Sequence, residues 1–205
     1  MSDLVFYTNP QSRGRMVRRM LEECGAQYRT EVVAYGEQMK SAAFRSINPM
    51  GKVPVITWQG RAVTEVAAII CFLAELFPEA ELAPPPEQRD AYYRWMFFVA
   101  GPLEAAVTNK ALGVSVADDK RAFVGYGSFE EVTETLTQAL AASTWIAGDK
   151  FSAADVYAGS HLDYGLRFGL LPQQQVLLDY RDRVSARGAW QRAEALDNAL
   201  LAPAG

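Results

Sequence analysis

Residues 53–76 read VPVITWQGRAVTEVAAIICFLAEL, and this stretch decides the fold. Residues 53–58 and 61–64 are short runs of β-branched and other apolar residues joined by Gln59-Gly60, a pattern that predicts a β-hairpin. Apolar residues then recur at helical spacing over residues 65–77, which predicts a helix directly after the second strand. A hairpin that runs straight into a helix indicates an α/β unit.

The residues upstream extend this unit. Residues 4–7 predict a first strand, residues 13–23 a helix that Gly25 ends, and residues 29–33 a second strand. A short helix is predicted over residues 40–46. The order is therefore βαβαββα, an α/β N-terminal domain.

Proline marks the end of this domain. Residues 77–86 read FPEAELAPPP, and three consecutive prolines cannot continue a helix. We expect a first domain over 1–79, a linker over 80–86 and a second domain over 87–205.

The second domain should be all-α, because helical patterns are the only clear ones in the sequence beyond the linker. They lie at residues 87–112, 129–143, 153–168, 174–186 and near Trp190.

Composition excludes several classes of function. The chain has 205 residues, with 20 Lys and Arg against 24 Asp and Glu, so a nucleic-acid partner has no electrostatic basis. No apolar run approaches the ~20 residues that span a membrane, and the first residues do not resemble an export signal. We therefore expect a cytoplasmic protein with no membrane association. Cys24, Cys71 and His161 do not have the spacing of a metal site, so we expect no metal.

Two places in the α/β domain are suited to binding a peptide. Val53-Pro54 is a plausible cis site at the start of a strand, where the Val53 backbone could pair with an extended peptide, although a plain strand-entry proline gives the same pattern. Thr64-Glu65-Val66 begins a helix, whose free N–H groups could receive a carboxylate while Glu65 pairs with an ammonium group. The alternative is that Thr64 and Glu65 only cap the helix.

These motifs together resemble a known family. Residues 7–15, 48–54 and 64–74, followed by a proline-rich linker and a helical domain, are similar to a cytosolic glutathione S-transferase of the bacterial, theta-like or delta-like serine type. The resemblance implies a thioredoxin-like N-terminal domain and a C-terminal helical bundle. Residues 146–155 resemble the buried capping box of that family, in which Ser152 caps a helix and Asp155 reaches back to the Ser152 N–H.

The resemblance also assigns residues to a glutathione site. In it Val53, before a cis Pro54, would hydrogen-bond the cysteinyl backbone, and Glu65 with the Val66 N–H would hold the γ-glutamyl group. Positive and polar side chains would face the glycyl carboxylate: Lys52 with Gln38 or Lys40. Members of the family usually carry Ser where this chain has Val66. The missing hydroxyl should cost about 1 kcal/mol of glutathione binding.

A transferase must also hold the glutathione thiol as a thiolate. Ser12 is the first candidate, because the resemblance places the catalytic serine of theta-like and delta-like members at the start of the first helix. Tyr7 is the rival, by similarity to classes that use a phenol at the end of the first strand. Arg13 and Arg15 either add positive potential beside the sulfur or are solvated.

The implied function is conjugation of glutathione to hydrophobic electrophiles by a homodimeric enzyme. Glutathione would be a co-substrate, and no cofactor is expected. The alternatives are a glutathione-dependent peroxidase or disulfide reductase on the same site, and a non-enzymatic binding or scaffold protein of the same fold. Cys24 and Cys71 fall inside helical patterns and are expected to be inert core thiols, and His161 is expected to be structural.

Overall fold

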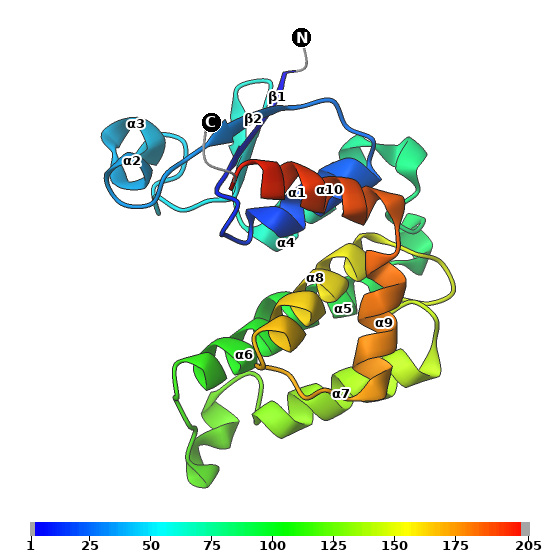
Figure 1. Cartoon of the computed structure of the whole chain (residues 1–205). Helices are drawn as coiled ribbons and strands as arrows, with labels where there is room; N and C mark the ends of the chain where they lie inside the picture. Colours follow the sequence, from blue (N-terminus) through cyan, green and yellow to red (C-terminus); the bar gives the residue numbers. More distant parts are fainter. Residues whose placement is uncertain (1–2, 202–205) are drawn as a thin grey trace. The chain divides into compact units, whose positions relative to one another are not determined.

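A computed structural model describes residues 3–201, and they form two compact units (Figure 1). Of the described residues, those up to Glu81 and those from Arg187 onward form the first unit, and the second is Leu82–Ala186. The sequence instead assigned all of 87–205 to the second domain, so the two divisions differ at the C-terminal helix. The outer ends of the predicted ranges, residues 1, 2 and 202–205, lie outside the described residues.

The first unit has the predicted order βαβαββα with two differences: two short helices stand where one was predicted, and α10 is added. Its elements are β1 (Leu4–Thr8), α1 (Gly14–Glu23), β2 (Arg29–Val32), α2 (Glu37–Lys40), α3 (Ala42–Arg45), β3 (Val55–Trp58), β4 (Arg61–Val63), α4 (Val66–Leu76) and α10 (Gly188–Ala199). The sheet has four strands in the order β2-β1-β3-β4. β1 pairs with β2 in parallel and with β3 antiparallel, and β3 pairs antiparallel with β4.

Local chemistry explains the hairpin and the interruption between α2 and α3. Gln59 and Gly60 both have positive φ, which the tight turn between β3 and β4 requires. The sequence predicted one helix over 40–46, but Ser41 is extended and its hydroxyl accepts a hydrogen bond from the Phe44 N–H. This serine therefore ends α2 and caps α3.

In the first unit, α1 packs against both α4 and α10, and Figure 1 shows α10 lying along α1. The apolar face of α1 is buried, as its helical spacing predicted. Arg18 and Arg19 are buried as well. A helix with apolar residues on one face and buried arginines on another is covered on more than one side.

The second unit is helical, as predicted. It contains α5 (Asp90–Phe98), α6 (Glu104–Ala111), α7 (Phe129–Ala142), α8 (Ala153–Arg167) and α9 (Gln175–Ser185). The helix predicted over 87–112 is interrupted by a π-helical turn, Val99–Leu103, which contains Pro102. Proline has no N–H to donate to the preceding turn, which accounts for the change in helical pitch.

The capping box at the start of α8 forms as expected. The Asp155 carboxylate accepts hydrogen bonds from the Ser152 N–H (2.9 Å), the Ile146 N–H (2.7 Å) and the Tyr180 hydroxyl (2.6 Å). Burial raises the pKa of Asp155, and these hydrogen bonds oppose the rise. The box fixes the first turn of a helix that is buried along most of its length.

Candidate active site

The strand register brings the end of β1 beside the turn that precedes β3. Tyr7 pairs with Val55 in the antiparallel ladder, and the same register continued by two residues places Asn9 opposite Val53. The Val53–Pro54 peptide is cis, as the resemblance implied. Val53 is half-buried and lies outside the strands, so its N–H and C=O are not used in the ladder.

The start of α4 comes to the same end of the sheet. Ile56 pairs with Val63 at the end of β4. The same antiparallel register, continued by two residues, places Glu65 opposite Pro54. Glu65 is exposed, its side chain makes no capping hydrogen bond, and its backbone has φ 66° and ψ 120°. A residue other than glycine in that region costs roughly 1–3 kcal/mol, and such strain is concentrated at functional sites. The first N–H groups of α4, from Val66 on, have no partner within the helix.

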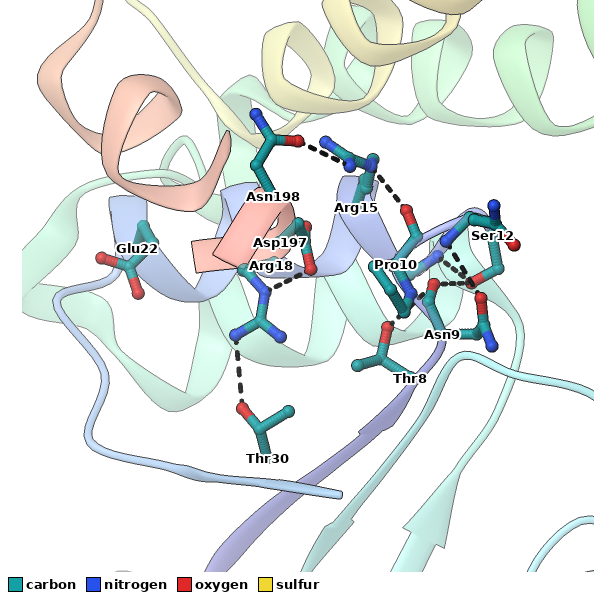
Figure 2. A network of polar contacts seen from close by, with 12 residues as sticks. Thr8, Asn9, Pro10, Ser12, Arg15, Arg18, Glu22, Thr30, Asp197 and Asn198 are labelled. Carbon is teal, nitrogen blue, oxygen red and sulfur yellow. Dashed lines mark hydrogen bonds and ion pairs between the residues drawn. The ribbon is translucent and has the colours of Figure 1, made fainter. Parts of the chain in front are cut away.

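Asn9 organises the loop between β1 and α1, where Figure 2 shows it beside Ser12. Its side-chain amide donates to the Val33 carbonyl (3.1 Å), and its Oδ1 accepts from the Gln11 N–H (3.0 Å). Its backbone carbonyl accepts from the Ser12 N–H at 2.9 Å. No local pattern predicted that Asn9 would build this loop. The Asn9-Pro10 pair predicted that a strand ends here.

Ser12, the predicted activating residue, lies half-buried at the mouth of α1. Its hydroxyl donates to the Asn9 carbonyl (2.7 Å) and accepts from the Gly14 N–H (2.9 Å). A hydroxyl has one proton, so donation to a bound sulfur requires the Ser12 hydroxyl to rotate away from the Asn9 carbonyl. Gly14 allows α1 to start this close to β1, because a Cβ there would overlap the Thr8 hydroxyl.

Tyr7 and Arg13 lie in different surroundings. The Tyr7 ring packs against Phe44, with centroids 6.0 Å apart, and against the apolar cluster that contains Met39 and Val55. It therefore serves the packing between the sheet and the α2–α3 region. Arg13 is exposed, next to Ser12 at the residue that precedes α1.

The lysines expected to face a carboxylate differ in their bonding. The Lys40 ammonium donates to the carbonyls of Met50 (3.0 Å) and Gly51 (2.8 Å), so it joins α2 to the loop before Val53. Lys52 is exposed in that loop. The Gln38 Oε1 accepts from the Ala34 N–H at 2.7 Å, which leaves its NH₂ group for other partners.

The remaining reactive side chains that the sequence singled out are Cys24, Cys71 and His161. Burial raises the pKa of the Cys24 thiol to about 12, and Cys71 is half-buried within α4. His161 is buried, with its Nδ1 3.5 Å from a Glu104 carboxylate oxygen. Among residues 3–201, His, Cys, Asp and Glu form no cluster of three or more that could hold a metal ion. No helix within that range is long and apolar enough to cross a membrane.

The N-terminal part of the chain matches a known protein family. The model of "Glutathione S-transferase, N-terminal domain" matches residues 12–76. Glutathione S-transferase DHAR2 of Arabidopsis thaliana is 29% identical over 142 residues, which are 66% of this chain and 58% of that protein. Residues 12–76 of this chain therefore match the N-terminal domain of the glutathione S-transferase family. The chain spans less than two thirds of the length of this curated relative.

Solved glutathione S-transferases have the same fold. A glutathione transferase from Methylococcus capsulatus strain Bath has a TM-score of 0.79 at 24% identity, covering 96% of this chain and 99% of that one. A sphingomonad glutathione S-transferase complexed with glutathione has a TM-score of 0.76 at 24% identity, covering 95% and 98%. The predicted fold class, a thioredoxin-like domain with a helical region, is confirmed. In this glutathione S-transferase fold, the three loops described above lie at one end of the sheet.

Proposed function

We propose that this glutathione S-transferase family member binds glutathione at the Val53 end of its sheet and conjugates the thiolate to hydrophobic electrophiles. The observation that carries the proposal is the strand register, which brings together the β1–α1 loop, the cis Val53–Pro54 turn and the start of α4. These three segments offer an unpaired backbone edge, free helix N–H groups and a hydroxyl. That set matches a peptide with a thiol between two charged ends.

Each part of glutathione has a complementary group there. The Val53 N–H and C=O would pair with the cysteinyl backbone, as a strand edge does with an extended peptide. The γ-glutamyl carboxylate would meet the Val66 N–H at the positive end of the α4 dipole, while Glu65 pairs with the ammonium group. Lys52, with the free NH₂ of Gln38 or the remaining N–H of Lys40, would face the glycyl carboxylate.

The thiol would be activated by Ser12. Lowering a cysteine pKa from ~8.5 by about 2 units requires about 2.7 kcal/mol of preference for the thiolate. A charge-assisted hydrogen bond from the Ser12 hydroxyl, together with the N-terminal end of α1, is of that order. The Asn9 carbonyl keeps its hydrogen bond from the Ser12 N–H when the hydroxyl turns to the sulfur. The thiolate then forms a bond to the electrophilic carbon, and the leaving group or the conjugated π-system takes the electron pair.

The test is an ultraviolet titration of thiolate absorbance for glutathione bound to the purified protein. S-methylglutathione, which has no thiol, gives the blank. We expect a bound thiol pKa well below that of free glutathione, and turnover of an aryl halide. A lowered pKa with turnover only of hydroperoxides or disulfides would replace conjugation by the peroxidase or reductase alternative. Binding with an unshifted pKa, or no binding, would favour a scaffold protein.

We also propose, on the resemblance, a cytoplasmic homodimer. Tyr93 and Phe97 lie one turn apart on α5 and are exposed in the single chain, which supports a contact with another subunit. Light scattering should give twice the chain mass of 22.6 kDa. A monomer at micromolar concentration would contradict this part of the proposal.

A further inference from the structure

We propose that Arg15 is a positioning residue, held by the C-terminal helix α10, that fixes the β1–α1 loop and with it the orientation of Ser12. The inference rests on the proposed function for its catalytic meaning. Its structural part, that α10 holds the loop through Arg15, stands on the contacts within the first unit alone.

The Arg15 guanidinium joins the loop to α10 (Figure 2). Its Nε donates to the Pro10 carbonyl at 2.6 Å, and its Nη2 donates to the Asn198 Oδ1 at 2.8 Å. Both donors belong to one planar, permanently charged group, so fixing one end of the group also fixes the other. Arg15 was expected to be solvated or to add positive potential beside the sulfur. In the structure it bonds to the backbone of the loop.

The hydrogen bond from Arg15 to the Pro10 carbonyl holds the loop at a point close to Ser12. Pro10 is buried and has no N–H, so its carbonyl is its one backbone group that can hydrogen-bond. It lies between Asn9, which accepts the Ser12 hydroxyl proton, and Ser12 itself. A shift of the Pro10 peptide therefore changes the distance between the Ser12 hydroxyl and the end of the sheet.

The partner of Arg15 on α10 is itself firmly placed. Asn198 follows Asp197, whose carboxylate is buried against the Arg18 guanidinium at 2.7 Å. At the other end of α10, the Arg187 guanidinium donates twice to Glu23, at 2.7 and 2.8 Å. Because both ends of α10 are tied to α1, Asn198 presents its oxygen to Arg15 at a fixed position.

The experiment compares two substitutions that each remove one exposed contact between α1 and α10. Asn198→Ala removes the acceptor of Arg15, and Arg192→Ala removes the contact to Glu22 without touching the loop. Hydrogen exchange of the backbone amides of residues 11–14, measured on the full chain without ligand, reports the loop directly. We expect at least tenfold faster exchange in Asn198→Ala, less than threefold in Arg192→Ala, and recovery in Asn198→Asp, which keeps an oxygen acceptor.

Steady-state kinetics gives the catalytic readout. We expect Asn198→Ala to lower kcat about 3- to 10-fold and to raise the pKa of the bound thiol, with the KM for glutathione within twofold of the wild-type value. Equal exchange rates in the two alanine variants would overturn the inference. Faster exchange with unchanged kcat and thiol pKa would overturn its catalytic part. If the wild-type chain does not lower the thiol pKa, the proposed function fails, and the exchange rates still decide whether α10 holds the loop.

Discussion

The Arg18 guanidinium in α1 lies 2.7 Å from the Asp197 carboxylate in α10, and the two residues are 2% and 1% exposed. Arg18 also donates to the hydroxyls of Tyr28 (3.1 Å) and Thr30 (3.2 Å), and it stands 5.0 Å from the centroid of the Phe6 ring. Burial raises the pKa of Asp197, and the Arg18 charge opposes the rise. The pair joins residues 179 positions apart, so the last helix is part of the N-terminal fold.

We predict that Asp197→Asn destabilises the protein, because it leaves the Arg18 charge buried without its counter-ion. Breaking a buried pair in this way costs about 3–5 kcal/mol, which denaturant unfolding will detect. The exposed pair between Arg192 and Glu22 provides the control, and Arg192→Ala should cost at most ~1 kcal/mol. Equal losses of unfolding free energy in the two variants would show that the buried pair contributes no more to stability than the exposed pair.

Ser12→Ala should lower conjugation about 10- to 1,000-fold while glutathione affinity stays within a few-fold. In the proposed site, the only part of glutathione that the Ser12 hydroxyl hydrogen-bonds is the thiolate. The backbone contacts that bind glutathione remain in the variant. Tyr7→Phe is the matched control. It removes a hydroxyl from a ring that packs against Phe44, and it should change kcat less than threefold. If Ser12→Ala keeps the full rate and Tyr7→Phe does not, the activating role belongs to Tyr7.

Gly14→Ala should lower the stability of the protein and displace the β1–α1 loop. The added methyl group would meet the Thr8 hydroxyl at the end of β1, so α1 must move away from the sheet. Overpacking of this kind costs about 1–3 kcal/mol, and we expect a lower Tm together with weaker glutathione binding. Gly125 has open space around its Cβ position, so Gly125→Ala serves as the control and should change neither property. A Gly14→Ala variant with the wild-type Tm would contradict the close approach.

Val66→Ser should strengthen glutathione binding several-fold. The substitution adds a hydroxyl at the first residue of α4, where the proposed γ-glutamyl carboxylate lies, and such a hydrogen bond contributes about 1 kcal/mol. Val66→Ala removes the same methyl groups without adding a hydroxyl, and it should give no gain in calorimetric titration. Equal affinities for the two variants would place the carboxylate elsewhere.

Cys24 should make stability fall at alkaline pH. Burial raises its pKa to about 12, and the nearby carboxylates of Glu23 and Glu79 add to the rise. The unfolded chain releases the thiol proton from about pH 8.5 upward while the native state keeps it, so the free energy of unfolding falls by up to about 1.4 kcal/mol per pH unit toward pH 12. Below pH 8 the thiol is neutral in both states and has no such effect.

The measurement is the difference in unfolding free energy between the wild-type protein and Cys24→Ala from pH 7.5 to 10.5. A constant offset below pH 8, followed by a decline in the wild type relative to the variant, is the expected result. Native Cys24 should also resist alkylation at pH 8 until the protein unfolds. Rapid alkylation of Cys24 in the native protein would contradict its burial.

The sequence determined the features that depend on neighbouring residues. The turn at Gln59-Gly60, the order βαβαββα and the capping box of Ser152 and Asp155 are all present in the structure. Backbone preferences, hydrophobic spacing and hydrogen bonds over three residues set these features, and all of them can be recognised in a short window of sequence. The resemblance to glutathione S-transferases also followed from such motifs, because the Val53–Pro54 turn and the start of α4 are themselves local.

Tertiary structure alone decided what the polar residues of α1 do. From the sequence, Arg15 was expected to be solvated or to lie beside the sulfur, and the buried roles of Arg18 and Arg19 gave no local signal. In the structure Arg18 pairs with Asp197, and the Arg19 guanidinium stacks 3.3 Å from the centroid of the Trp190 ring. These partners belong to α10, which lies far along the chain. Spacing within one helix shows which residues share a face, but only the folded chain shows which distant helix covers that face.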